Sequence, residues 1–230
     1  MTAPAKCALP PISRAVGAGP DTISSFALDE PCAAAQNHGF VATLPKHDAP
    51  ALEAAIDRVA AGIAQRHAAT PHLLLLGIAN GGIVLAQRLA ARLKKAGLKP
   101  GLGTIDISFH RDDIGCHPIP KEFSPTIIPH DVNGATVVLV DDVLHSGRTV
   151  KAALDELFDH GRPATVELAV LIDRGGRKLP VAAKWCGLAV NATDAEKVVV
   201  RLDPHTPAKD TFALQPARRR TATPFPATSP

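Results

Sequence analysis

The chain has 230 residues, of which 46% are hydrophobic and 20% charged, and this suffices for one hydrophobic core of ordinary size. The formal net charge is only +3, a mild basic bias that neither requires nor excludes a nucleic-acid partner. No apolar run approaches the roughly 18 residues that a membrane span needs, and prolines interrupt the N-terminus where a signal peptide would be apolar. The four cysteines show no metal-like spacing, so we expect a cytoplasmic protein with reduced thiols and no membrane partner.

Composition divides the chain into three parts. Residues 1–46 are rich in alanine, proline, glycine and serine, which predicts a flexible extension. Residues 204–230 have a similar composition and are predicted to form a flexible, proline-rich tail. The folded domain is therefore expected over residues 48–203.

The folded domain opens with a helix, a strand and a second helix. Residues 51–67, ALEAAIDRVAAGIAQRH, carry apolar side chains at helical spacing. Residues 72–78, HLLLLGI, form a short apolar run that is typical of a strand covered on both faces. An Asn-Gly-Gly turn then leads into a helix over residues 83–97, which has a basic last turn and ends at a glycine.

The second half continues the alternation. GTIDISF, residues 103–109, alternates like a strand, and the long proline-containing connection 110–134 is typical of a functional lid. A central strand is predicted over 136–142 and a helix over 148–161, with further strands at 165–173 and 197–203. This order predicts an α/β fold with a mainly parallel sheet flanked by helices. Ligands bind beyond the carboxyl ends of such strands.

The segment VVLVDDVLHSGRT, residues 137–149, carries the clearest chemistry. Asp141 and Asp142 stand at the end of a buried strand, where two carboxylates are costly unless a partner compensates them. The Ser-Gly-Arg-Thr turn that follows leads into a helix, whose first amides can bind an anion. Carboxylates accept hydrogen bonds from sugar hydroxyls, so the segment fits a sugar phosphate. An acidic strand end followed by a helix cap is the alternative, and the nucleotide motifs GxxxxGK[ST] and GxGxxG are absent.

The same segment resembles the phosphoribosyl pyrophosphate (PRPP) signature of type I phosphoribosyltransferases. IDISFHRDD, DELFDHGRPATVELAVLIDRGGRKLP and EKVVVRLD narrow the resemblance to the PyrR family, the bifunctional pyrimidine-operon attenuation regulators and uracil phosphoribosyltransferases. The resemblance covers roughly residues 50–203. It implies a type I phosphoribosyltransferase fold with a small hood segment, and assembly as a homodimer or homotetramer.

The resemblance also implies roles for individual residues. Asp141 and Asp142 would hold the ribose hydroxyls of PRPP, and Arg111, in the lid, would contact pyrophosphate. Uracil would be joined to C1′ to give UMP and pyrophosphate, with Mg²⁺ held mainly through PRPP and not directly by the protein. The implied 5′-phosphate loop consists of His145, Ser146, Gly147, Arg148 and Thr149. The implied pyrophosphate loop consists of Asn80, Gly81 and Gly82.

The chain departs from the PyrR pattern at two places. The pattern has Thr-Arg-Gly where this chain has Asn-Gly-Gly at residues 80–82, which removes an arginine donor to pyrophosphate. In the PyrR family a basic face meets the attenuator RNA, and this chain keeps Arg174, Arg177 and Lys178 of that face. Gly176 and Ala182 replace a histidine and an arginine there, which weakens a phosphate-binding surface.

Three functions therefore stay open. The first is an active phosphoribosyltransferase for uracil, and the second is a PRPP- or UMP-sensing regulator, acting through RNA or another partner, with weak or no catalysis. The third is a phosphoribosyltransferase for a purine base, because the phosphate motif does not read the base. Two expectations follow: replacing both Asp141 and Asp142 by asparagine abolishes PRPP binding, and Gly81→Arg raises turnover if the missing arginine limits catalysis.

Overall fold

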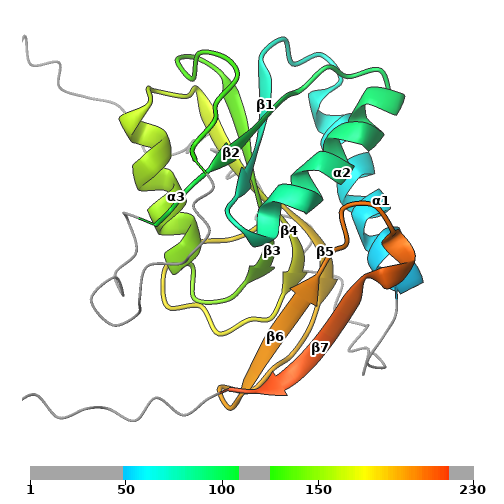
Figure 1. The fold of residues 1–230 in the computed structure, drawn as a ribbon. Helices are drawn as coiled ribbons and strands as arrows, with labels where there is room; N and C mark the ends of the chain where they lie inside the picture. Colours follow the sequence, from blue (N-terminus) through cyan, green and yellow to red (C-terminus); the bar gives the residue numbers. More distant parts are fainter. Residues whose placement is uncertain (1–48, 109–124, 218–230) are drawn as a thin grey trace, which may run out of the picture. The chain divides into compact units, whose positions relative to one another are not determined.

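A five-stranded parallel sheet forms the centre of the molecule (Figure 1). A computed structural model describes residues 49–108 and 125–217. Within them the strand order is β2-β1-β3-β4-β5, and every pair of neighbours is parallel. The predicted α/β fold with a mainly parallel sheet is confirmed. The strands are β1 (Leu73–Ile78), β2 (Gly101–Ile105), β3 (Thr136–Leu144), β4 (Thr165–Asp173) and β5 (Trp185–Ala189).

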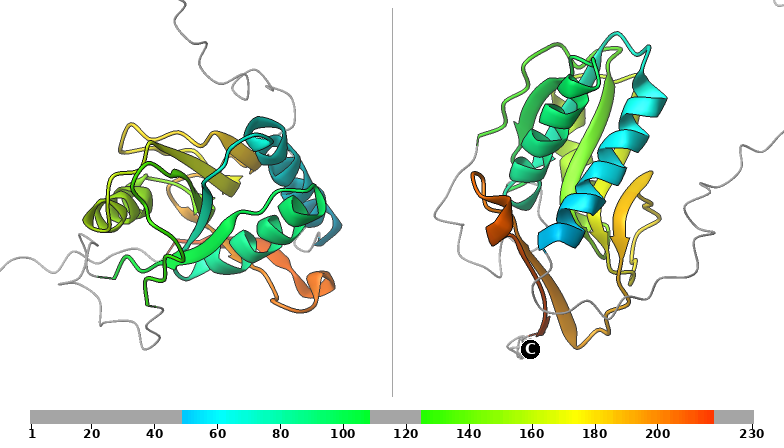
Figure 2. Two further views of the ribbon diagram at one scale, coloured as in Figure 1. Left: turned by 90° about the horizontal axis from the view of Figure 1, so that it is seen from above. Right: turned by 90° about the vertical axis from the view of Figure 1, so that its right-hand side faces the viewer.

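Helices cover both faces of the sheet. Helices α1 (Ala49–His67) and α2 (Gly81–Lys95) pack on one face, and α3 (Arg148–Asp159) packs on the other (Figures 1 and 2). Successive residues of a strand point to opposite faces, so β3 sends Val138 and Val140 toward α1 and α2, and Val137 and Leu139 toward α3. This double burial explains why the strands are apolar at nearly every position.

A small antiparallel sheet stands beyond the carboxyl ends of the parallel strands (Figure 1). It consists of β6 (Glu196–Arg201) and β7 (Thr211–Pro216), joined by a connection that contains a 3-10 turn at Pro207–Lys209. We call this pair of strands the hood. The prediction of a flexible tail from residue 204 is wrong for residues 204–217, because β7 pairs along the whole of β6 and buries Phe212.

A buried ion pair anchors the hood to the helical layer. Asp210 is 2% exposed, and its carboxylate accepts hydrogen bonds from Arg88 of α2 and from the backbone amide of Asp203 at 2.8 Å. The Arg88 Nη2 also donates to the carbonyl oxygen of Asp203 at 2.5 Å. Two residues 122 positions apart in the sequence thereby hold the β6–β7 connection against α2.

The structure differs from the sequence-based prediction at three further elements. β5 was missed, because its five residues lack a clear alternation, and it places Trp185 at the edge of the parallel sheet against His67 of α1. β2 begins at Gly101 and ends at Ile105, earlier than predicted. β3 continues through the acidic pair to Leu144.

The predicted extension 1–46, Arg111 and most of the predicted lid lie outside the described residues. Over the ranges described, none of the helices is long and apolar enough to cross a membrane.

Candidate functional site

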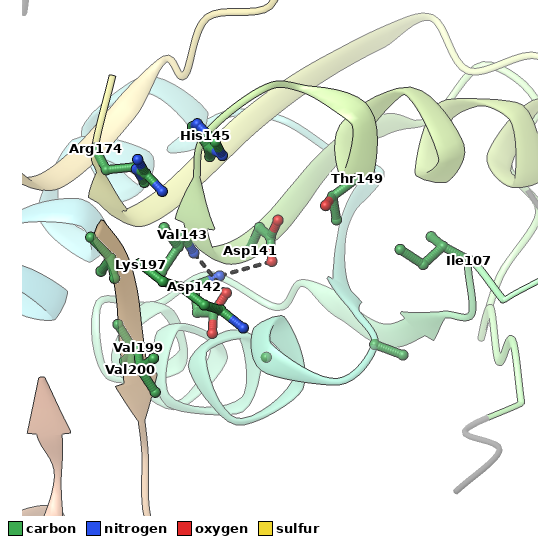
Figure 3. Close-up of a pocket in the computed structure, with 13 residues that line it drawn as sticks. Ile107, Asp141, Asp142, Val143, His145, Thr149, Arg174, Lys197, Val199 and Val200 are labelled. Atoms are coloured by element: carbon green, nitrogen blue, oxygen red, sulfur yellow. Dashed lines mark hydrogen bonds between the residues drawn. The ribbon is translucent and has the colours of Figure 1, made fainter. Parts of the chain in front are cut away.

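A pocket of about 470 Å³ lies between the carboxyl ends of the parallel strands and the hood (Figure 3). The acidic pair lies between two different ends of this pocket. Thr149, in the first turn of α3, lies at one end, and Arg174 with the β6 residues Lys197 and Val199 lies at the other. The lining residues are Ala79, Gly81, Ile107, Asp141, Asp142, Val143, His145, Thr149, Arg174, Lys197, Val198, Val199 and Val200.

Asp141 and Asp142 both line the pocket, although the strand does not end at them as predicted. The register of β3 with β4 continues past the pair, with Asp141 opposite Val170 and Val143 opposite Ile172. Each carboxylate accepts a hydrogen bond from the next backbone amide: Asp142 N donates to Asp141 Oδ1 at 3.0 Å, and Val143 N donates to Asp142 Oδ1 at 2.7 Å. These short-range bonds hold both carboxylates at the pocket surface.

The acidic pair is electrostatically costly as it stands. Burial raises the pKa of Asp141 well above its ordinary value, and the neighbouring Asp142 charge raises it further. Burial also raises the pKa of Asp142, although the backbone amide of Val143 and the Lys197 ammonium oppose this shift. A ligand that donates hydrogen bonds or brings a cation would therefore stabilise the ionised pair.

The loop after β3 is held in a fixed conformation. Gly147 has φ = 91°, which favours glycine, and its position against Leu179 and Val181 leaves little room for a side chain. The carbonyl oxygen of Ser146 accepts hydrogen bonds from the amides of Lys178 and Leu179, both at 3.0 Å. Helix α3 begins directly afterwards at Arg148, so its first amides face the space next to this loop.

Arg177 braces the same loop from behind. Its Nη1 donates to the carbonyl oxygens of His145 at 2.8 Å and Leu144 at 3.3 Å, and its Nε donates to that of Val181 at 3.1 Å. The remaining nitrogen pairs with the Asp173 carboxylate. These contacts turn the guanidinium inward to the backbone.

The predicted RNA-binding arginines are thus engaged inside the protein. Arg174 is 7% exposed and lines the pocket, and Arg177 binds backbone carbonyls. Lys178 alone of the three predicted residues is exposed. The structure therefore does not bring the three together as an outward basic surface.

The two glycines of the Asn80-Gly81-Gly82 turn approach β3 so closely that a side chain on either one would collide with it. A Cβ built on Gly81 would lie 2.4 Å from the Asp142 carboxylate, and one on Gly82 would lie 2.0 Å from the Val140 carbonyl oxygen. The peptide bond between Ala79 and Asn80 is cis. The expectation that Gly81→Arg raises turnover loses its basis, because the new side chain would displace Asp142.

Sequence reasoning missed the hood wall of the pocket. Val198, Val199 and Val200 of β6, together with Ile107 and Val143, supply its apolar lining. The apolar run in EKVVVRLD predicted a strand, but only the fold shows that this strand covers the pocket.

Within the described ranges there is no cluster of three or more His, Cys, Asp or Glu side chains that could hold a metal ion.

Comparisons with known proteins agree on one family. The phosphoribosyl transferase domain family matches residues 47–204. The chain is 46% identical over 156 residues to "Bifunctional protein PyrR" of Roseiflexus sp. (strain RS-1), a match that covers 67% of this chain and 85% of the relative. It is 45% identical over 172 residues to "Bifunctional protein PyrR" of Listeria monocytogenes serotype 4a (strain HCC23), which covers 73% of this chain and 93% of the relative.

Solved structures support the fold. The hypoxanthine phosphoribosyltransferase of Trypanosoma cruzi superposes with a TM-score of 0.52 at 20% identity, covering 65% of this chain and 82% of that protein. A hypoxanthine-guanine phosphoribosyltransferase from Bacillus anthracis gives a TM-score of 0.51 at 20% identity, covering 64% and 86%. The predicted type I phosphoribosyltransferase fold is confirmed.

Proposed function

The chain belongs to the phosphoribosyltransferase family and, within it, to the PyrR proteins, and from this premise we propose that it transfers the phosphoribosyl group of PRPP to uracil, giving UMP and pyrophosphate. The observation that carries the proposal is the acidic pair, of which Asp141 is buried, between the α3 end and the hood end of one pocket. A ribosyl group held by Asp141 and Asp142 would present its 5′-phosphate to the α3 end and C1′ to the hood end. Both reactive partners then fit into about 470 Å³.

The chemistry assigned to the chain is mainly positioning and charge stabilisation. The carboxylates accept the ribose 2′- and 3′-hydroxyls, and the amides at the start of α3, with the Ser146 and Thr149 hydroxyls, bind the 5′-phosphate. As the bond from C1′ to pyrophosphate breaks, positive charge develops on the ribose ring, and the buried carboxylates stabilise it. The apolar β6 wall excludes water, which would otherwise compete with the base.

Mg²⁺ fits this site as a cofactor carried by the substrate. The two adjacent carboxylates that line the pocket accept the ribose hydroxyls, so oxygens of PRPP would hold the ion beside this negatively charged pair. When bound, it would neutralise the departing pyrophosphate. The amides of Gly81 and Gly82, at the start of α2, are the protein groups that we assign to the pyrophosphate, and Gly81 lines the pocket beside Asp142.

A second candidate is a PRPP- or UMP-sensing regulator with weak catalysis. It is favoured by the Asn-Gly-Gly turn at residues 80–82, which has Gly81 where the PyrR pattern has an arginine donor to pyrophosphate. RNA is the partner that the PyrR resemblance implies, with exposed Lys178 as a contact. The inward direction of Arg174 and Arg177 makes RNA binding the weaker part of this candidate.

Assembly as a homodimer or homotetramer is a further proposal, and light scattering would measure the mass of the assembly.

One experiment separates these functions. The purified chain is incubated with PRPP, Mg²⁺ and labelled uracil, hypoxanthine or guanine in separate reactions, and nucleotide formation is followed. UMP formed in the uracil reaction supports the proposal, and nucleotide formed only with a purine assigns the enzyme to that base. PRPP binding by calorimetry without turnover on any base supports the regulator. Absence of both turnover and PRPP binding refutes the assignment of the pocket.

A further inference from the structure

Two buried donor groups beside the acidic pair have no partner in the part of the chain that the structure describes. Arg174 follows β4 directly, and its Nη2 donates to the carbonyl oxygen of Thr193 at 3.1 Å, but its buried Nε has no hydrogen-bond partner. His145 follows β3 directly, and its Nε2 is also buried without a partner. Buried polar atoms are nearly always hydrogen-bonded, so a pair of exceptions in one pocket points to a missing ligand.

The positions of His145 and Arg174 in the pocket indicate which part of a ligand they would contact. His145 and Arg174 both line the pocket and interact electrostatically; Arg174 lies on the side away from Thr149, and His145 lies between Arg174 and Thr149 (Figure 3). Val143 and the β6 residues Val198 and Val199 line the pocket with them. Apolar walls with a few fixed donors suit a planar heterocycle better than a phosphate, for which the first amides of α3 are available.

We propose that Arg174 Nε and His145 Nε2 read the edge of the acceptor base, and that they select a base with a carbonyl oxygen at that edge over one with an amino group in the same place. The inference rests on the proposed phosphoribosyl transfer and adds the residues that determine base specificity. It reassigns Arg174 from the predicted RNA surface, and His145 from the predicted 5′-phosphate loop, to recognition of the base.

The chemistry of the two side chains produces this selectivity. A guanidinium has only donors, so Arg174 Nε–H pairs with a carbonyl oxygen and is left unsatisfied by an amino group. A buried donor left without a partner carries the full cost of its desolvation, and such sites discriminate strongly. The His145 imidazole offers either an N–H or a lone pair, so it pairs with a second carbonyl or with the ring N–H of the same base.

Binding of three ligands tests the proposal without requiring turnover. Ribose 5-phosphate reports on the sugar and phosphate contacts alone, and UMP and CMP add bases that differ at one edge. With Mg²⁺ present, calorimetry on the wild-type chain should show tighter binding of UMP than of CMP. Arg174→Met should weaken UMP about 10- to 100-fold, the range expected for a lost hydrogen bond to a charged donor, and should remove the preference over CMP. Its affinity for ribose 5-phosphate should not change.

Two further variants separate recognition from structure. Arg174→Lys keeps the positive charge but loses the fixed Nε–H, so it should also lose the UMP preference. Arg58→Met is the matched control, because Arg58 donates to the Gly187 carbonyl oxygen at 2.7 Å but does not line the pocket, and it should bind UMP as the wild type does.

The outcomes distinguish the inference from its premise. If Arg174→Met weakens UMP and ribose 5-phosphate equally, or leaves the preference for UMP intact, Arg174 only fastens the Thr193 segment and the inference is wrong. If the wild-type chain binds UMP and CMP equally, base selection by this pair is refuted while the PRPP site stands. If it binds none of the three ligands, the proposed function itself fails.

Discussion

A methyl group added at Gly81 tests the closest contact in the pocket. Gly81 is the first residue of α2, and a Cβ at this position would lie 2.4 Å from the Asp142 Cγ and Oδ2 atoms. Ordinary contacts between such atoms are about 3.5 Å, so the carboxylate has to retreat by about 1 Å. The perturbation therefore acts on the acidic pair and leaves the backbone of β3 untouched.

The expected effect is large on function and small on stability. A 1 Å misplacement of a positioning group costs about 100-fold in rate, so Gly81→Ala should lower turnover with PRPP by about that factor. The Asp142 side chain can rotate away from the new methyl group, so the backbone of β3 does not have to shift. We therefore expect the free energy of unfolding to change by no more than about 1 kcal/mol.

Gly82→Ala is the matched comparison. Its Cβ would lie 2.0 Å from the Val140 carbonyl oxygen, which belongs to the backbone of the central strand and cannot rotate away. Overpacking of this kind typically costs about 1–3 kcal/mol, so this variant should lose stability in urea as well as activity. Urea unfolding and PRPP-dependent turnover are measured on both variants. A Gly81→Ala protein with wild-type turnover would refute the close coupling of the glycine turn to Asp142.

Three other variants test the supports of the site. Arg88→Met leaves the buried Asp210 carboxylate with only a backbone donor, so it should lower the free energy of unfolding, measured in urea, by about 3 kcal/mol. Replacing Asp210 by leucine in the same protein should restore most of this stability. If stability is not restored, the ion pair does not anchor the hood. Asp141 has a folded-state pKa above its unfolded value, so the folded state binds more protons, and stability without ligand should fall as the pH rises from about 4 through that raised pKa. Asp141→Asn removes this titration, so the unfolding temperature should depend less on pH, and ribose 5-phosphate binding should be abolished. If the unfolding temperature changes with pH as in the wild type, the raised pKa does not belong to Asp141. Arg177→Met should raise the KM for PRPP about 10-fold with little change in kcat, because it loosens the carbonyls of the phosphate loop, and a purely RNA-binding role would leave this KM unchanged.

Much of the fold follows from local patterns in the sequence. The apolar runs at residues 72–78 and 136–142 predicted buried parallel strands, since a strand covered on both faces has no polar side. β5 escaped prediction because it is an edge strand of five residues with half-buried positions. β7 escaped because proline-rich composition concealed a strand that is stabilised by pairing with β6 and by the buried Asp210.

The sequence by itself determined that two carboxylates and a Ser-Gly-Arg-Thr turn stand together at the start of a helix, because both lie within thirteen consecutive residues. Only the tertiary structure decided what faces them. It brings the glycine turn from β1 against Asp142, covers the pocket with β6, and turns Arg174 and Arg177 inward. These contacts join residues far apart in the chain, and the direction of a charged side chain depends on the backbone groups and pockets that surround it. Local sequence patterns carry no record of that environment.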